Sequence, residues 1–265
     1  VLFRSVAIAS EGRNDESLPQ TEEIIRAGKH VWYDKPAGDN WDHFQRIVAL
    51  AREKGLIIQM GYMFRHHDGF QRIAHWVKSG LLGDIFSIRA HMSTWIPEPA
   101  RKVISVHKGG IFFDLAGHMI DQIVWLLGRP TKVTSFLRHD DKLVPGFEDN
   151  TLAVLEYPKA MAMVDIAAME TRPMARRFEV YGSLGSAIME PFEPVRGIRL
   201  CLERPRDGFL KGEQFVLVED RPRYVLSLVS FLAAVRGEQP PERSLDHELL
   251  VQETLLRATG HLPGG

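Results

Sequence analysis

The chain has 265 residues, a length that fits one large or two medium-sized domains. Apolar residues make up 45% of it and charged residues 25%, which is ordinary for a globular protein and excludes a disordered or collagen-like chain. The 33 basic residues balance 34 acidic ones, so the charge indicates no nucleic-acid or membrane partner. The sole cysteine, Cys201, excludes an intrachain disulfide and agrees with the cytoplasmic location that we expect.

The first third of the chain alternates between strand and helix patterns. Short apolar runs are typical of buried strands, and amphipathic segments that end at a glycine are typical of helices. Strands are predicted at Val6–Ala9, His30–Tyr33 and Leu56–Ile58, and helices at Thr21–Arg26, 40–54 and Phe70–Ser79. This order predicts an α/β unit with a parallel sheet covered by helices on both faces.

After Gly83 the pattern changes to the polar–apolar alternation of a sheet with one buried face. In residues 85–95, Phe86, Ile88, Ala90 and Met92 are expected on one face, with Arg89 and His91 on the other. Further strands are predicted near 132–138, 151–157, 162–168, 177–181, 186–190, 198–203 and 214–218, and helices near 115–127, 223–236 and 246–259. The predicted fold is an α/β remnant followed by an α+β domain with a large, mainly antiparallel open sheet.

The helix predicted near 115–127 has a polar side that could carry chemistry. Asp114 and His118 are four residues apart, so their side chains can meet on the first turn. A carboxylate in that position fixes the imidazole tautomer and leaves the other ring nitrogen free to take a proton. The alternative, which spacing alone favours, is the solvated face of an amphipathic helix.

A lysine follows the second predicted strand, in the sequence Tyr33-Asp34-Lys35-Pro36. Parallel sheets place their ligands at the carboxyl ends of strands, where a lysine can hydrogen-bond a substrate oxygen. The alternative is a plain turn stiffened by Pro36.

Three consecutive residues of metal-ligand type, His66, His67 and Asp68, follow the third strand. Neighbouring side chains on an extended segment point to opposite sides, so we expect a loop and a helix cap and no metal site. The chain contains no Gly-x-Gly-x-x-Gly or other phosphate-binding loop.

Taken together, these segments resemble the glucose–fructose oxidoreductase and inositol dehydrogenase (Gfo/Idh/MocA) family of NAD(P)-dependent oxidoreductases. The similar motifs are Ala27–Val31 leading into Asp34–Pro36, then Gly61–Arg65, Gly109–Asp121, Phe147–Asn150 and Tyr181–Gly185. They occur in the family's order and span essentially the whole chain.

The resemblance implies NAD or NADP as cofactor and a sugar, polyol or related hydroxyl compound as substrate. Lys35 matches the family's lysine that contacts nicotinamide and substrate, and Pro36 and Ser10 are expected beside it in the cofactor site. Asp114 and His118 match the substrate-binding and proton-transferring pair.

The resemblance also implies that Arg65 and His91 line the sugar pocket and that the open sheet pairs with a partner's, giving a homodimer or homotetramer. In this sequence Asp34 stands where the family usually has glutamate.

The family's dinucleotide fingerprint would lie before Val1, so we expect a piece of a longer enzyme that is inactive alone. Residues 1–64 would be the end of a Rossmann domain, and residues 65–265 the substrate-binding and oligomerisation domain.

Two other classes stay open. One is a non-catalytic sugar-binding relative of the same fold, against which the presence of Lys35, Asp114 and His118 argues. The other is a metal-dependent isomerase or hydrolase that uses His66, His67, Asp68 and His75. The sequence names neither the individual substrate nor the direction of the reaction.

Overall fold

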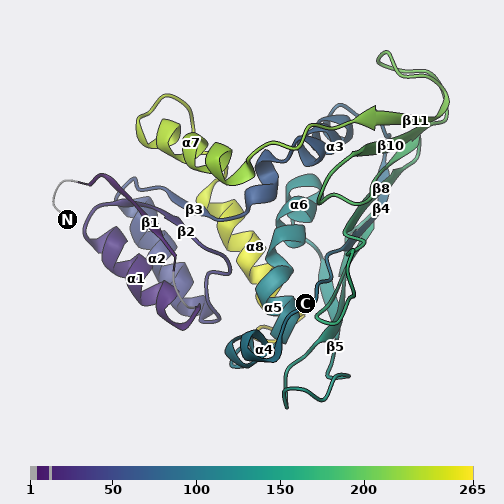
Figure 1. Ribbon diagram of the computed structural model, residues 1–265. Helices are drawn as coiled ribbons and strands as arrows, with labels where there is room; N and C mark the ends of the chain where they lie inside the picture. Colours follow the sequence, from purple (N-terminus) through teal and green to yellow (C-terminus); the bar gives the residue numbers. More distant parts are fainter. Residues whose placement is uncertain (1–4, 12–13, 265) are drawn as a thin grey trace.

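The computed structural model describes residues 5–11 and 14–264. Val1, where the predicted first domain starts, lies outside them. The described chain forms a three-stranded sheet of order β1-β2-β3 and an eight-stranded sheet of order β11-β10-β9-β8-β4-β7-β6-β5. In Figure 1 the small sheet and its helices lie on one side and the large sheet on the other, with a layer of helices between them.

The small sheet is parallel, as the sequence predicts. It consists of β1 (Ala7–Ser10), β2 (His30–Tyr33) and β3 (Ile58–Met60), connected by helices α1 (Asn14–Arg26) and α2 (Trp41–Glu53). Helix α2 begins where the Asn40 side chain accepts a hydrogen bond from the His43 amide, and its apolar stripe is buried. Helix α1 is longer than predicted.

The large sheet is antiparallel except where β4 pairs in parallel with β7. Its strands are β4 (Ile85–His91), β5 (Lys132–Arg138), β6 (Asn150–Glu156), β7 (Met161–Ala167), β8 (Arg177–Gly182), β9 (Gly185–Met189), β10 (Gly197–Leu202) and β11 (Gly212–Leu217). All of them were predicted to within a few residues, because one face of each strand is apolar.

One residue departs from the predicted alternation. Phe86 is 54% exposed, whereas Ile88 and Ala90 are buried. The register between β4 and β8 shifts between Ile85 and Ser87, and this irregularity sends Phe86 to the open side. Ile85 packs against the core in its place.

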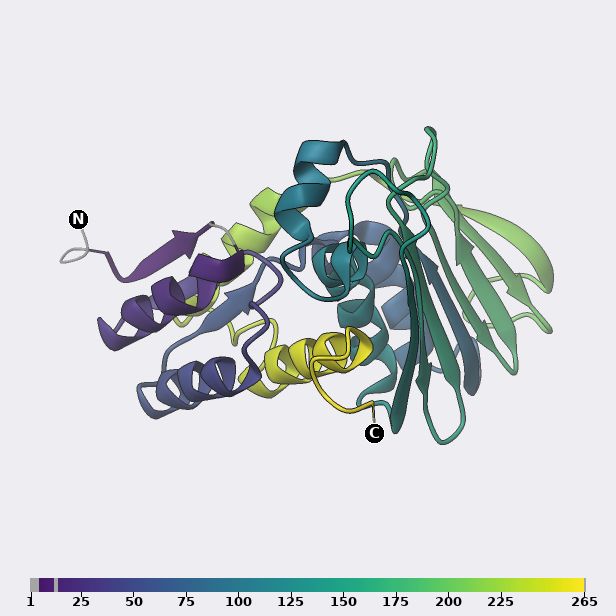
Figure 2. The same cartoon turned by 90° about the horizontal axis from the view of Figure 1, so that it is seen from below.

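Figure 2 shows the helices gathered on one side of the large sheet. They are η1 (Met63–His66), α3 (Asp68–Lys78), α4 (Glu98–Ile104), α5 (Gly110–Leu115), α6 (Gly117–Leu127), α7 (Arg223–Val235) and α8 (Leu245–Ala258). The helix expected at 115–127 is α6, and the two shorter helices α4 and α5 were not predicted. None of the described helices is long and apolar enough to cross a membrane.

The last helix connects the two sheets. Helix α8 packs against α2 and β3 on one side and against α6 and β5 on the other. One core cluster therefore includes Val31 of the small sheet and Val164 of the large sheet. The boundary predicted between residues 64 and 65 falls inside η1, and the division into domains stays a prediction.

Candidate active site

Lys35 lies just after β2, at the carboxyl end of the small parallel sheet. Its ammonium nitrogen is 2.7 Å from the backbone oxygen of Asp114 and 3.3 Å from the Asp114 carboxylate. The lysine side chain is only 14% exposed. A further N–H of the ammonium group stays available for another oxygen.

The turn that carries Lys35 is fixed from two sides. The Asp34 carboxylate accepts a hydrogen bond from the Lys35 amide at 2.8 Å. From α8, the buried Gln252 side chain accepts from the Ala37 amide at 3.2 Å and donates to the Gly38 carbonyl at 2.6 Å. Sequence reasoning missed Gln252, since nothing in its local pattern separates it from other polar residues of a helix.

Asp114 lies near the end of α5 and does not make the predicted contact with His118. Its carboxylate pairs with Lys35, and the helix is interrupted at Ala116, between α5 and α6. Gly117 starts α6 against the Tyr62 ring, where an added Cβ would come within 3.2 Å of a ring carbon. The local geometry thus orients Asp114 towards the lysine, 79 residues earlier in the chain.

His118 is buried, with 4% of its surface exposed, which rules out the solvated helix face considered above. The edges of Phe64 and Tyr62 pack against it, with ring centroids 5.3 and 6.3 Å from its own. Its Nδ1 atom finds no hydrogen-bond partner among the described residues. Burial, followed by the charge of Lys35, lowers the pKa of His118 well below its ordinary value.

An imidazole with a lowered pKa therefore lies within the influence of a mostly buried ammonium group. The imidazole can accept a proton, and the ammonium group can stabilise negative charge on the oxygen that loses it. This combination suits chemistry at a hydroxyl or carbonyl oxygen.

Arg65 has different surroundings from those expected. Its guanidinium donates to both oxygens of the fully buried Asp121, at 2.7 and 2.9 Å, and lies 4.2 Å from the centre of the Trp125 ring. His247 of α8 bonds the same carboxylate at 2.8 Å. These are the contacts of a structural ion pair, and the predicted binding of substrate by Arg65 stays a prediction.

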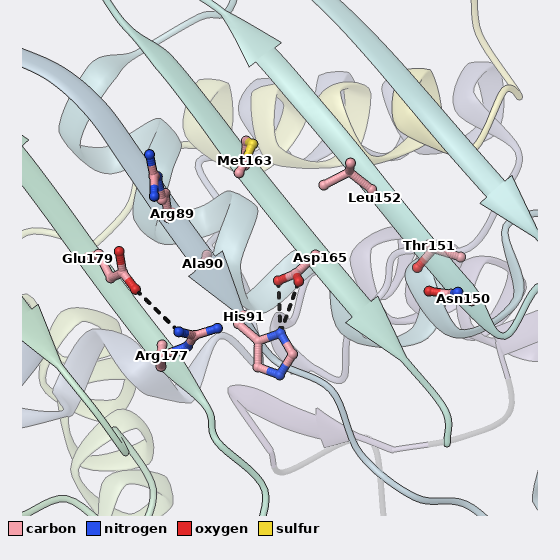
Figure 3. A pocket seen from close by; sticks show the side chains of 10 residues that line it. All are labelled: Arg89, Ala90, His91, Asn150, Thr151, Leu152, Met163, Asp165, Arg177 and Glu179. Carbon is pink, nitrogen blue, oxygen red and sulfur yellow. Dashed lines mark hydrogen bonds and ion pairs between the residues drawn. The ribbon is translucent and has the colours of Figure 1, made fainter. Parts of the chain in front are cut away.

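His91 lies on the open face of the large sheet, opposite the buried Ile88 and Ala90, as the alternation along its strand predicts. Its Nδ1 is 2.9 Å from the Asp165 carboxylate and its Nε2 is 3.4 Å from Glu170. Figure 3 shows it with Arg177 and Glu179 in a cavity of about 440 Å³, with the helices behind the strands. Its neighbour Ala90 faces the helices, so alternation along β4 directs His91 away from them.

The structure therefore does not bring His91 into the cluster of Lys35, Asp114 and His118. Its predicted role in the sugar pocket finds no support in these contacts.

The expected cofactor residues share one edge of the small sheet. Ser10 ends β1, and its carbonyl accepts a hydrogen bond from the Asp34 amide at 3.1 Å, beside Lys35. The Ser10 hydroxyl is 3.4 Å from the Gln20 side chain. The donors of Lys35 and Ser10 at the carboxyl ends of parallel strands fit the nicotinamide end of a dinucleotide.

The three consecutive ligand-type residues diverge. His66 bonds Glu242 at 2.8 Å, His67 bonds the carbonyl of Phe192 at 3.0 Å, and Asp68 reaches towards Arg72. Within the described ranges, no three such side chains are grouped to hold a metal ion.

Comparisons with known proteins show which family the chain is similar to. Residues 70–188 match the family model described as the GFO/IDH/MocA C-terminal domain. The oxidoreductase YdgJ of Escherichia coli K12 is 28% identical over 94% of this chain and 66% of its own length. The dTDP-3,4-didehydro-2,6-dideoxy-alpha-D-glucose 3-reductase of Streptomyces violaceoruber is 29% identical over 82% of this chain and 63% of its own.

Among solved structures, the UDP-N-acetylglucosamine 3-dehydrogenase GnnA of Acidithiobacillus ferrooxidans superposes with a TM-score of 0.82 at 17% identity. The match covers 98% of this chain and 80% of that one, and it supports the fold alone. The chain thus spans about two thirds of the length of the curated relatives that it matches. The matched model, these relatives and the ordered motifs agree, so the chain is similar to the Gfo/Idh/MocA oxidoreductases and its residues 70–188 match their C-terminal domain.

Proposed function

We propose that this chain carries the catalytic residues of an NAD(P)-dependent oxidoreductase that acts on a hydroxyl or carbonyl group of a sugar, polyol or related compound. The observation that carries the proposal is that the buried His118 has a pKa lowered by burial and by the charge of Lys35, whose ammonium group Asp114 holds in place. The names of the curated relatives, one of which is a dTDP-sugar reductase, support the substrate class.

In the oxidation direction, His118 accepts the proton of the substrate hydroxyl. Lys35 donates a hydrogen bond to the same oxygen and stabilises the charge that develops on it. Asp114 holds the ammonium group in position through its carbonyl and its carboxylate, so it acts as a positioning residue. In the reverse direction His118 returns the proton to the carbonyl oxygen.

Lys35, Pro36 and Ser10 are the residues that would hold the nicotinamide end of NAD or NADP, which supplies the hydride chemistry when bound. Neither cofactor is favoured by the residues at this edge.

We further propose a homodimer or homotetramer formed through the open face of the large sheet. Several strands expose large apolar side chains, as expected of a surface that another subunit covers: Phe86, Phe136, Met161, Phe215 and Leu217.

The test is a hydride-transfer assay on the protein that contains this sequence, with NAD or NADP and a panel of sugars and polyols, followed through the nicotinamide absorbance. Turnover that persists in the presence of a chelator supports the proposal and excludes the metal-dependent alternative. Sugar binding without turnover under all conditions would favour the non-catalytic alternative.

A further inference from the structure

Two arginines from different parts of the chain share one carboxylate beside the candidate active site. Arg176 precedes β8, and Arg223 starts α7. The guanidinium of each binds one oxygen of Glu193, which lies on the loop between β9 and β10. The side chains of Arg176, Arg223 and Glu193 are 13%, 14% and 29% exposed.

This cluster adjoins His118. The Arg223 guanidinium lies 4.9 Å from the centre of the Phe64 ring, and the edge of that ring packs on His118. After burial and Lys35, the charges of Arg176 and Arg223 also contribute to lowering the pKa of His118. A substrate whose hydroxyl group reaches His118 is therefore also close enough to feel the charges of both arginines.

The two guanidinium groups share the single carboxylate of Glu193, and Asp220 is a further acidic group that acts on Arg223. Within the described part of the chain, Nε of Arg176 and Nη1 of Arg223 have no hydrogen-bond partner although both atoms are buried. Burial and the charge of Arg223 lower the pKa of Arg176, which reflects the repulsion between the two guanidinium groups. Glu170 opposes this effect, but its carboxylate already accepts hydrogen bonds from His91 and the Ala175 amide.

The backbone of Arg176 is strained. Its φ of 40° lies in the left-handed region, which costs conformational energy for any residue with a Cβ. The Arg176 carbonyl is fixed in this conformation by the Phe192 amide, at 2.8 Å. Strain of this kind persists where the surrounding structure enforces it and is typical of functional positions.

There is space for a ligand next to the cluster. A cavity of about 760 Å³ is bounded by the loops before β8 and after β9, and Glu193 lines it together with Met174, Pro191 and Pro194. Of the three residues of the cluster, Glu193 is the one that lines this cavity.

We propose that Arg176 and Arg223 bind an acidic group of the substrate, a carboxylate or a phosphoryl group, and so select acidic sugar derivatives over neutral ones. Paired guanidinium groups suit both anions, because their N–H donors match the geometry of carboxylate and phosphate oxygens. The inference rests on the proposed function for the identity of the site, but it concerns binding and can be tested without turnover.

The experiment is a calorimetric titration of the protein with D-glucuronate, D-glucose 6-phosphate and D-glucose, with and without NAD or NADP. The variants are Arg176→Gln and Arg223→Gln, with Arg221→Gln as the matched control. Arg221 is an exposed arginine of the same segment, paired with Glu219. The melting temperature of each variant is recorded to establish that it folds, and Arg176→Lys provides a second variant that keeps the charge.

We expect one of the two acidic sugars to bind at least about tenfold more tightly than D-glucose, as a charge-assisted hydrogen bond would give. Each glutamine variant should remove that preference, while Arg221→Gln should retain it. The acid that binds identifies the group as carboxylate or phosphoryl. Equal binding of acidic and neutral sugars, or a preference unchanged in folded Arg176→Gln and Arg223→Gln proteins, would overturn the inference. Turnover of neutral polyols alone would overturn it while leaving the proposed function intact.

Discussion

The ammonium group of Lys35 and the carbonyl oxygen of Asp114 are 2.7 Å apart, although the two residues are separated by 79 positions in the sequence. This contact joins the small parallel sheet to the helices that line the large one. The orientation of the lysine therefore depends on how these two parts of the molecule pack.

The role of His118 can be tested with His118→Ala. If His118 carries the proton, kcat should fall by roughly 10²–10⁴, the usual contribution of a positioned general acid–base. Steady-state kinetics with an active substrate measures this. The control is His75→Ala, because His75 is exposed on α3. A His118→Ala enzyme with unchanged kcat would remove the histidine from the proposed chemistry.

Lys35→Ala should lower both kcat and the apparent affinity for substrate, because the ammonium group touches the reacting oxygen in the ground state and in the transition state. Asp114→Asn retains the size of the side chain but loses its charge. We expect it to lower kcat less than Lys35→Ala does, since the backbone carbonyl of Asp114 still binds Lys35. An Asp114→Asn enzyme as impaired as Lys35→Ala would show that the carboxylate contacts the substrate directly.

The ion pair of Arg65 and Asp121 should matter mainly for stability. Their side chains are 2% and 0% exposed. Arg65→Met removes the cation that binds both oxygens of the buried Asp121 carboxylate, and we expect it to lower the free energy of unfolding by about 3–5 kcal/mol. Urea denaturation measures the change. Arg72→Met is the control, since the Arg72–Asp68 pair is partly exposed and should contribute at most about 1 kcal/mol. A stable Arg65→Met protein with weakened substrate binding would support the pocket role.

The contribution of His91, on the open face of the sheet, to the stability of the protein should depend on pH. Hydrogen bonding to Asp165 raises the pKa of His91 above its ordinary value. Because the pKa of His91 is higher in the folded than in the unfolded protein, its protonation stabilises the fold. This stabilisation is complete at pH values below the unfolded pKa of about 6.5, and it disappears as the pH rises through the pKa of the folded state. Unfolding curves should therefore show that His91→Gln destabilises the protein at acidic pH and has a smaller effect at alkaline pH. A pH-independent difference would contradict this account.

Self-association through the large sheet can be measured by light scattering at micromolar concentration. The expected mass is that of a dimer or tetramer, because a stable interface usually buries at least about 1,200 Å². Phe136→Glu and Phe215→Glu place charges on the exposed apolar positions of the sheet and should shift the mass towards a monomer. A monomeric unmodified protein would contradict the prediction.

Local sequence patterns were sufficient to predict most helices and strands. They failed where contacts between distant parts of the chain determine the local structure. Alternation identified the strands of the large sheet, but the bulge that exposes Phe86 depends on pairing with β8. Helix α4 was missed because it is short and contains Pro99, with no apolar stripe to reveal it. Helical spacing indicated that Asp114 could reach His118. In the structure the partner of Asp114 is Lys35, which comes from another part of the chain.

Burial was the other property that the sequence concealed. In the sequence, the polar side of the helix that contains His118 resembles a solvent-exposed surface. In the structure this side is buried, because Phe64 packs against His118 and Arg65 pairs with Asp121.

The two hydrogen bonds of Gln252 give the last helix a part in assembling the site. The turn that carries Lys35 has no regular structure of its own, and α8 fixes it at Ala37 and Gly38. The shape of the turn therefore depends on a helix that lies 215 positions further along the chain. Partial unfolding of α8 would therefore free the turn at Ala37 and Gly38 and leave Lys35 with its contacts to Asp34 and Asp114.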